Sequence, residues 1–404
     1  MDKGKSQAKA VAPTQKSLFN AGKRTNKGIA DRDESHFSFL NRSAWKSVGI
    51  ARRTLENWFS VLPESKKEDI RSRFRIDERQ HHGALLELAI HQLLNLICTG
   101  VQVDPSFNNL TPDFAATYEG TKLVVECTVT QETDQDFNAT QREVRIKKAI
   151  DSIDTGRFLL SWDLLSAGEK QPPTGVLCGK IKRWVDSLDA DEEMLRFERS
   201  HRTNSMEWRQ DGWEIHFEAL PVHSYPTQER VKRAIGIEYG GGGWRQDDVR
   251  LKKALTKKAA KYRHLELPFL VVLSSASVYV YEQDLIEALL GHTVLVGCFR
   301  PQGIEPDFQP RHEFDGLFGS PSKPKNRHLS AILFKPRIGV WTLCAYDAPW
   351  LLIHHPWAEY PLPLGMFPFA TEWIPKAGEF AKVRPTVTLN AVLGLADPWP
   401  GMER

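Results

Sequence analysis

Asp113 and Glu126 are two acidic residues that come together if the segment between them folds as a β-hairpin. The runs on either side of Glu119-Gly120 are rich in β-forming side chains, and this dipeptide suits a two-residue turn. In that register Asp113 lies directly opposite Glu126, and opposed side chains share one face with Cβ atoms about 4.5–5.5 Å apart. Carboxylates this close repel each other unless a proton or a cation lies between them. A divalent cation such as Mg²⁺, which prefers oxygen ligands, is the simplest solution.

Glu87 is a third acidic residue, and it lies upstream in an apolar segment. Residues 82–97 have the composition of a mostly buried helix, and leucine and isoleucine side chains surround Glu87. A lone buried charge costs several kcal/mol, so Glu87 needs a partner. The hairpin carboxylates together with a metal ion could provide one.

Lys258 is the basic residue that we expect nearest to these carboxylates. Residues 248–262 form a helix by propensity and spacing, with an apolar stripe that includes Leu255 and Tyr262. Lys258 falls on this stripe, and a strand over 268–273 follows at once. Its ammonium is therefore predicted to point toward the core, with Lys261 and the basic helix at 142–148 as substitutes. The alternative is a surface lysine whose aliphatic stem lies along the stripe.

The order of these parts resembles the PD-(D/E)xK nuclease superfamily, which has the restriction-endonuclease-like fold. The matching residues are Glu87, Pro112-Asp113 and Glu126, and the match extends to a third strand at 158–160. The chain departs from the pattern at Thr128, where the superfamily usually has a lysine. It is also similar to a group of uncharacterised bacterial proteins of this superfamily, in the leading helix and in residues 208–221. The resemblance covers roughly residues 40–360, but only the three carboxylates are specific chemistry.

The resemblance implies an α/β (α+β) fold with an αβββαβ core, in which helices flank a mixed sheet. It also implies a Mg²⁺-dependent endodeoxyribonuclease, with Mn²⁺ as a substitute. Asp113 and Glu126 would bind the metal, Glu87 would complete its shell, and Lys258 would orient or activate the attacking water. Restriction, repair and defence against phage are roles found in this superfamily. The alternative is an inactive nuclease-fold module that binds nucleic acid or a partner protein; RNA as the substrate is a weaker idea, and a homodimer stays open.

Composition is that of an ordinary soluble globular protein, with 41% hydrophobic and 26% charged residues. At 404 residues the chain is longer than one typical domain, so two or three units are expected. The net charge of +3 requires local clustering of basic residues at any nucleic-acid surface. The chain lacks a run of about 18 uncharged apolar residues, which predicts no membrane span. Five scattered cysteines and no signal peptide predict reduced thiols in the cytoplasm and no zinc finger.

Changes in amino-acid composition along the chain predict four regions. Residues 1–35 are polar and basic and are expected to form a disordered tail. Residues 36–78 are predicted as a helical lead-in, and residues 79–290 as the nuclease-like core with an insertion at about 165–247. From 291 to 404 the sequence is rich in Pro and aromatic residues, and we expect it to wrap the core.

Basic residues after the hairpin are the predicted nucleic-acid contacts, namely Arg142, Arg145, Lys148 and Lys180. The Gly240–Gly243 run lacks the residues of a phosphate-binding loop and is expected to be a bend or lid. His81-His82 and His91 are too far apart on one helix to form a compact site, which favours capping or surface roles. The sequence also lacks GxSxG and HExxH motifs, so acyl transfer and zinc-protease chemistry are disfavoured.

Overall fold

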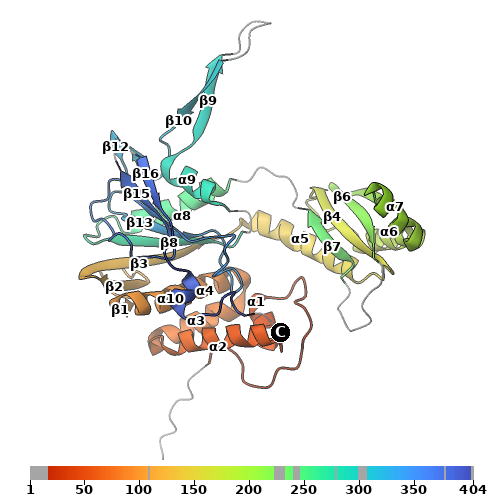
Figure 1. Cartoon of the computed structure of the whole chain (residues 1–404), viewed down its shortest axis with the longest axis horizontal. Helices are drawn as coiled ribbons and strands as arrows, with labels where there is room; N and C mark the ends of the chain where they lie inside the picture. Colours follow the sequence, from red (N-terminus) through yellow and green to blue (C-terminus); the bar gives the residue numbers. More distant parts are fainter. Residues whose placement is uncertain are drawn as a thin grey trace, which may run out of the picture.

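A mixed eight-stranded sheet forms the centre of the computed structural model, which describes residues 17–107, 110–222, 233–239, 246–277, 280–298, 307–376 and 379–401. Its strand order is β1-β2-β3-β8-β13-β14-β15-β16. Two apolar clusters lie on its two faces, one shared with the N-terminal helices and the other with α8 and α9. Figure 1 shows this layering. The protein therefore has a mixed α/β fold in which helices cover both faces of a large sheet.

The N-terminal helices cover one face of the sheet and include the long helix that bears Glu87. Ser35 caps the first helix through its side chain, and Asp77 caps the fourth in the same way. The helices of this layer are α1 His36–Arg42, α2 Lys46–Ser60, α3 Glu64–Ile76 and α4 Glu78–Ile97, the last of which includes the helix expected over 82–97.

The hairpin that carries Asp113 and Glu126 has the predicted register. β2 (Phe114–Tyr118) pairs antiparallel with β3 (Thr121–Thr130), with Tyr118 opposite Thr121 and Phe114 opposite Val125. Glu119 and Gly120 form the turn with φ values of 44° and 81°, the backbone sign that a type I′ hairpin turn needs. Asp113 directly precedes β2. β1 (Thr99–Val103) completes this three-stranded edge by pairing with β2.

The predicted helix-strand pair that bears Lys258 packs beside this hairpin. α8 (Asp247–Lys261) leads into β8 (Phe269–Ser275), and β8 runs parallel to β3. α9 (Glu282–Leu290) packs next to α8. Because a parallel pair needs a crossover connection, the placement of β8 beside β3 brings α8 onto the face of the sheet that Glu126 occupies.

The C-terminal region does more than wrap the core, since it supplies half of the central sheet. Pro-rich loops separate its short strands, and for this reason the strands were not recognised in the sequence. After the β9–β10 ribbon described below, the elements of this region are β11 Gly319–Ser320, β12 Lys323–Pro324, β13 Ala331–Lys335, β14 Leu351–His354, β15 Thr371–Lys376, β16 Glu379–Val383 and α10 Leu389–Leu393.

A second lobe with its own apolar core is inserted between β3 and α8. Its four-stranded sheet has the order β5-β6-β4-β7, and Trp162, Trp208 and Trp213 are buried in it. α5 extends from the main body to this lobe (Figure 1). The bounds are α5 Asp134–Asp151, β4 Phe158–Ser166, α6 Thr174–Asp186, α7 Ala190–Ser200, β5 Asn204–Gln210, β6 Trp213–Pro221 and β7 Ile235–Tyr239.

The lobe corrects one prediction about the core. Residues 158–160 were expected to form its third strand, but they belong to β4 in the second sheet. β1, which the sequence analysis missed, is the third strand beside the hairpin. The predicted insertion is thus larger than expected and begins with α5. The Gly240–Gly243 run lies outside the described residues.

Two further segments lie apart from the layers. β9 (Thr293–Cys298) and β10 (Asp307–His312) form a two-stranded ribbon that projects from the main body (Figure 1).

Of the predicted disordered tail, residues 1–16 lie outside the described residues, while Leu18 and Phe19 are buried in the core. Their backbone amides donate to the Glu56 carboxylate, which holds the second half of the tail in place.

Within the described part of the chain, every helix is too short or too polar to cross a lipid bilayer.

Candidate functional site

Glu126 is the centre of the candidate site. It is 3% exposed, and side chains of α8 and of Tyr262, which directly follows α8, approach its two carboxylate oxygens. Lys258 Nζ donates to Glu126 Oε1 at 2.7 Å, and Tyr262 Oη donates to Glu126 Oε2 at 2.6 Å. Lys261 Nζ lies 3.5 Å from Oε1. The expected approach of Lys258 to the hairpin carboxylates is therefore present, and Lys261, its expected substitute, is also near.

Tyr262 contributes more than apolar packing to this site. The sequence placed it on the apolar stripe of the helix, and its ring is buried against Phe269. Burial, together with the hydrogen bond to Glu126, raises the pKa of the Tyr262 hydroxyl far above its ordinary value. The hydroxyl thus stays protonated and donates its one proton to Glu126, while the Thr111 carbonyl oxygen lies 3.2 Å from the same hydroxyl oxygen. A buried Tyr on a stripe usually needs such a partner, which is the signal that could have identified it.

Asp113 lies at the start of the hairpin with a carboxylate that is largely uncompensated. Its Oδ2 accepts a hydrogen bond from the Cys127 amide at 2.7 Å. Burial, followed by the negative charges of Glu87 and Glu126, raises the pKa of the Asp113 carboxyl to about 7. The Cys127 amide and Lys258 act in the opposite direction but do not cancel this effect. Asp113 therefore lies within electrostatic range of both other predicted ligands, in surroundings that favour its protonated form.

Glu87 has cationic partners that the sequence analysis did not identify. Arg73 of α3 donates to both Glu87 oxygens, at 2.8 Å and 2.7 Å, and Lys66 Nζ lies 3.4 Å from Oε2. Burial lowers the pKa of Lys66, but Glu87 and Asp104 outweigh it and raise the pKa to about 12. The partner of the buried Glu87 is thus the two-pronged Arg73 guanidinium rather than the hairpin itself. α3 packs against α4, and this contact is not visible in the sequence.

The fit of a Mg²⁺ ion to the three carboxylates rests on Asp113. Burial is the main cause of its raised pKa and the charges of Glu87 and Glu126 add to it; a bound divalent cation would favour the charged form instead. Glu126 and Glu87 are already paired with cations, and in the described part of the chain the three do not form a group with ligand atoms all within 4.8 Å. The hairpin register brings Asp113 opposite Glu126, and the charge of Glu87 on α4 also acts on Asp113.

The four predicted nucleic-acid contacts lie in the second lobe. Arg145 and Lys180 are exposed on α5 and α6, while Arg142 is half-buried. Lys148 Nζ lies 2.6 Å from Asp33 Oδ2 and is thereby engaged in an ion pair. Arg145 and Lys180 are therefore the most available of the four for a phosphate backbone.

The histidines of α4 differ from their predicted surface roles. His81, His82 and His91 are all buried. Their helix is covered on several sides, because α1, α3 and the sheet all contact it. His91 is distant in sequence from the other two, as expected, but His82 lies beside His36 and Glu78 from the helix starts. The sequence analysis did not identify this group.

Comparison with known proteins gives only partial matches. The chain is 30% identical over 151 residues to non-structural protein 1 of influenza A virus (strain A/Beijing/39/1975 H3N2) and 29% identical over 151 residues to that of strain A/Swine/Colorado/1/1977 H3N2. Each match covers 36% of this chain and 62% of the viral protein, so the chain spans less than two thirds of the relatives it matches. No protein-family model matches the chain, and no solved structure does.

Proposed function

We propose that the protein is a metal-dependent nuclease that hydrolyses phosphodiester bonds of DNA. Asp113 and Glu126 would hold Mg²⁺, and Glu87 would complete the shell directly or through water. When bound, the metal would lower the pKa of a water and stabilise the negative charge that develops on phosphate. The biological setting that we propose is defence against phage or foreign DNA.

The observation that carries this proposal is the hydrogen bond between Lys258 and Glu126. The two residues are 132 positions apart in sequence, yet Nζ and Oε1 are separated by 2.7 Å. A nuclease of the PD-(D/E)xK kind needs a cation beside its second acidic strand residue, and here Thr128 cannot supply one. Lys258 supplies this charge from α8, where its ammonium can orient a water and hold a phosphate oxygen.

The order of elements supports the same proposal. α4, β1, β2, β3, α8 and β8 follow one another as αβββαβ once the second lobe is set aside, and β3 is parallel to β8. This order is the one that the resemblance to the restriction-endonuclease-like fold implies. The parallel pairing places Glu126 opposite Val271 of β8 and so near the helix that precedes β8.

A cleavage assay on the purified full-length protein tests the proposal. Supercoiled plasmid, single-stranded DNA and RNA are incubated with Mg²⁺, Mn²⁺ or EDTA. We expect metal-dependent cleavage of DNA, which the Asp113→Asn and Glu126→Gln variants lose while they keep their circular dichroism spectrum. Glu119→Gln, at the exposed turn of the same hairpin, is the matched control and keeps activity. Cleavage at the wild-type rate by either site variant would contradict the proposal.

The second candidate function is an inactive nuclease-fold module that binds nucleic acid or a partner protein. The observation that favours it is that Glu87 and Glu126 are both already neutralised by protein cations. DNA binding without cleavage under any metal condition would support this alternative. Cleavage of RNA in preference to DNA would instead change the substrate class and leave the metal-site residues as they are.

A further inference from the structure

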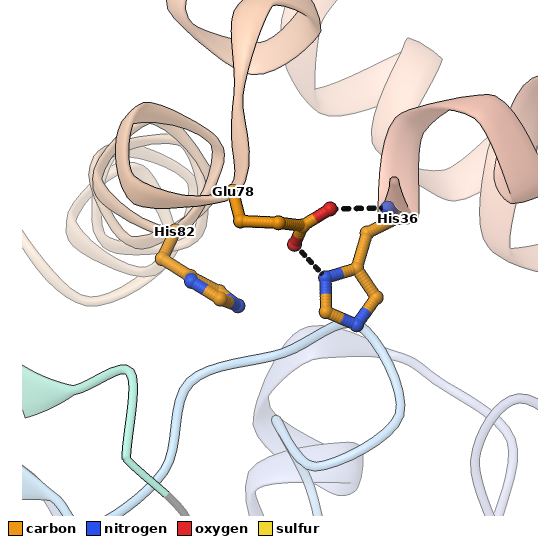
Figure 2. A group of neighbouring side chains, drawn as sticks. All are labelled: His36, Glu78 and His82. Carbon is orange, nitrogen blue, oxygen red and sulfur yellow. Dashed lines mark hydrogen bonds and ion pairs between the residues drawn. The ribbon is translucent and has the colours of Figure 1, made fainter. Parts of the chain in front are cut away.

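We propose that His36, Glu78 and His82 form a Zn²⁺ site that joins the start of α1 to the start of α4. These are the residues of the described chain that offer three ligand atoms all within 4.8 Å of one another. Figure 2 shows the two imidazole rings and the carboxylate facing one another. This site is separate from the carboxylates of the proposed nuclease, and the inference does not depend on that function.

Helix geometry explains why these side chains converge. Glu78 and His82 are four residues apart on α4, so they lie on one face of the helix, one turn from each other. His36 is the first residue of α1, and its backbone amide donates to Glu78 Oε1 at 2.6 Å. Its ring Nδ1 also contacts Glu78 Oε2. Glu78 is thereby fixed in an orientation that presents a carboxylate oxygen to both rings.

His82 provides independent evidence for a ligand. The residue is 8% exposed, and its ring packs against that of His36 at 5.4 Å between centroids. Its Nδ1 is buried and has no hydrogen-bond partner in the described part of the chain. A buried polar atom without a partner costs about 1–3 kcal/mol. A metal ion bound through this nitrogen would remove the cost.

The donor set selects the class of metal. Two imidazole nitrogens and one carboxylate oxygen are ligands that Zn²⁺ binds readily, whereas Mg²⁺ prefers oxygen ligands alone. Three protein ligands leave a fourth tetrahedral position for water, and the His36 side chain, which is 51% exposed, places that position toward solvent. The neighbouring His81 is not available as a ligand through Nδ1, since that atom lies 2.8 Å from the Phe74 carbonyl.

A zinc ion at this position would add a bond between α1 and α4 to the contacts that His36 already makes with Glu78, His81 and His82. α4 also carries Glu87, so the same helix would bear a zinc ligand near its start and a residue of the nuclease-like site in its middle. The expected consequence is a more stable N-terminal helical layer. We therefore expect Zn²⁺ to stabilise the protein against heat, since a ligand that binds only the folded state raises its stability.

Zinc binding to the full-length protein tests this proposal. The protein is treated with EDTA, dialysed and titrated with Zn²⁺ in competition with a chromophoric chelator, and its melting temperature is followed in parallel. The His36→Ala and Glu78→Gln variants change residues outside the core and so keep the fold, and His82→Asn tests the buried ligand. His264→Ala, an exposed histidine after α8, is the matched control. Asp113→Asn distinguishes this site from the hairpin carboxylates.

We expect one equivalent of Zn²⁺ and a rise in melting temperature for wild type, His264→Ala and Asp113→Asn. Loss of a ligand should weaken binding by more than the roughly 10–100-fold typical of losing an outer-shell partner. Co²⁺ in place of Zn²⁺ should give visible absorption bands that disappear in His36→Ala. Absence of stoichiometric zinc binding in the wild type, or wild-type affinity in both His36→Ala and Glu78→Gln, would overturn the proposal.

Discussion

At the scale of single residues, the candidate site is a set of buried carboxylates that differ in how their charge is balanced. Glu126 receives hydrogen bonds from Lys258 and Tyr262, and Glu87 receives two from Arg73. Asp113 has only a backbone amide as a donor in the described chain, and its pKa is raised to about 7. Charge is thus least compensated at the residue that begins the hairpin, which makes Asp113 the strongest candidate for a metal ligand.

The Lys258→Met variant is expected to lose DNA cleavage and to become less stable. It leaves the buried Glu126 carboxylate with Tyr262 and the more distant Lys261, and removing one partner of a buried charged hydrogen bond costs about 1–3 kcal/mol. Urea unfolding and the plasmid assay measure the two effects. Lys257→Met, an exposed lysine on the same helix, is the control and should match wild type in both. An active, fully stable Lys258→Met protein would show that Lys258 has no role.

Glu372 gives the protein a predictable dependence on pH. Burial by itself raises the pKa of Glu372, but hydrogen bonds from His354 at 2.7 Å and from the Gly365 amide outweigh it and lower the pKa below its ordinary value of 4.5. The unfolded chain therefore binds the proton more readily than the folded protein. The resulting stability is present above pH 4.5 and is lost as the pH falls through the lower folded value.

The Glu372→Gln variant is accordingly expected to be about 1–3 kcal/mol less stable than wild type at pH 7. The difference should shrink as the pH falls below 4.5, because Glu372 then takes up a proton first in the unfolded chain and, at lower pH, in the folded protein. Urea unfolding at a series of pH values measures it. A difference that stays constant down to pH 3.5 would mean that the carboxylate charge of Glu372 contributes nothing.

At the scale of elements, the hairpin from β2 to β3 sets the geometry of the site. Its turn places Glu119 at a φ of 44°, a left-handed conformation that a residue with a Cβ adopts at some cost. Asn tolerates this conformation better and is preferred at the first position of a type I′ turn. Glu119→Asn is therefore expected to raise the free energy of unfolding by about 0.5–1 kcal/mol. Lys122→Asn, within β3, is the contrasting control and should lower it; a destabilised Glu119→Asn would contradict the turn assignment.

The elements that the sequence predicted well are those determined by local pattern. The turn at Glu119-Gly120 fixes the register of β2 with β3, and the spacing of Leu251 and Leu255 identifies α8. Lys258 could be placed near Glu126 because α8 immediately precedes β8. These arguments use only the residues that neighbour each position in the sequence.

The features that the sequence did not reveal depend on contacts between distant segments. Residues 158–160 have the apolar pattern of a buried strand, but pattern alone does not indicate which sheet a strand joins. β13 and β14 are short and lie between Pro-rich loops, so their partners appear only in the fold. Arg73 and His36 contact their partners because their helices pack against α4. Sequence periodicity identifies helices but does not predict which helices pack together.

At the scale of the whole molecule, the predicted DNA surface and the candidate site lie in different parts of the structure. Arg145 and Lys180 are exposed on the second lobe, whereas Lys148 is paired with Asp33. If this lobe binds DNA, its affinity falls steeply with salt, and each phosphate contact adds about −0.9 to the log–log slope. The Arg145→Glu and Lys180→Glu double variant should reduce the slope by about two contacts, while Lys323→Glu on β12 should leave it unchanged. A flat salt dependence in wild type would exclude these residues as the main contact surface.

The two lobes have separate apolar cores, which predicts that they respond separately to core mutations. The second lobe buries Ile181, Leu177 and Trp162 in a cluster of its own. The described contacts between this lobe and the rest of the chain are polar. For example, Arg32 Nε lies 2.5 Å from Asp151 Oδ2. In the described part of the chain, the apolar cluster of this lobe contains side chains of the lobe alone, so the two cores do not share packing.

The Ile181→Ala variant is therefore expected to destabilise the second lobe by about 2–5 kcal/mol while the main body keeps its stability. Differential scanning calorimetry should show two transitions, of which this variant lowers only one. Leu255→Ala, which opens a cavity between α8 and the central sheet, should lower the other transition. A single transition that both variants shift equally would mean that the lobes unfold as one unit, and the polar contacts of Arg32 would then carry far more coupling than ion pairs usually do.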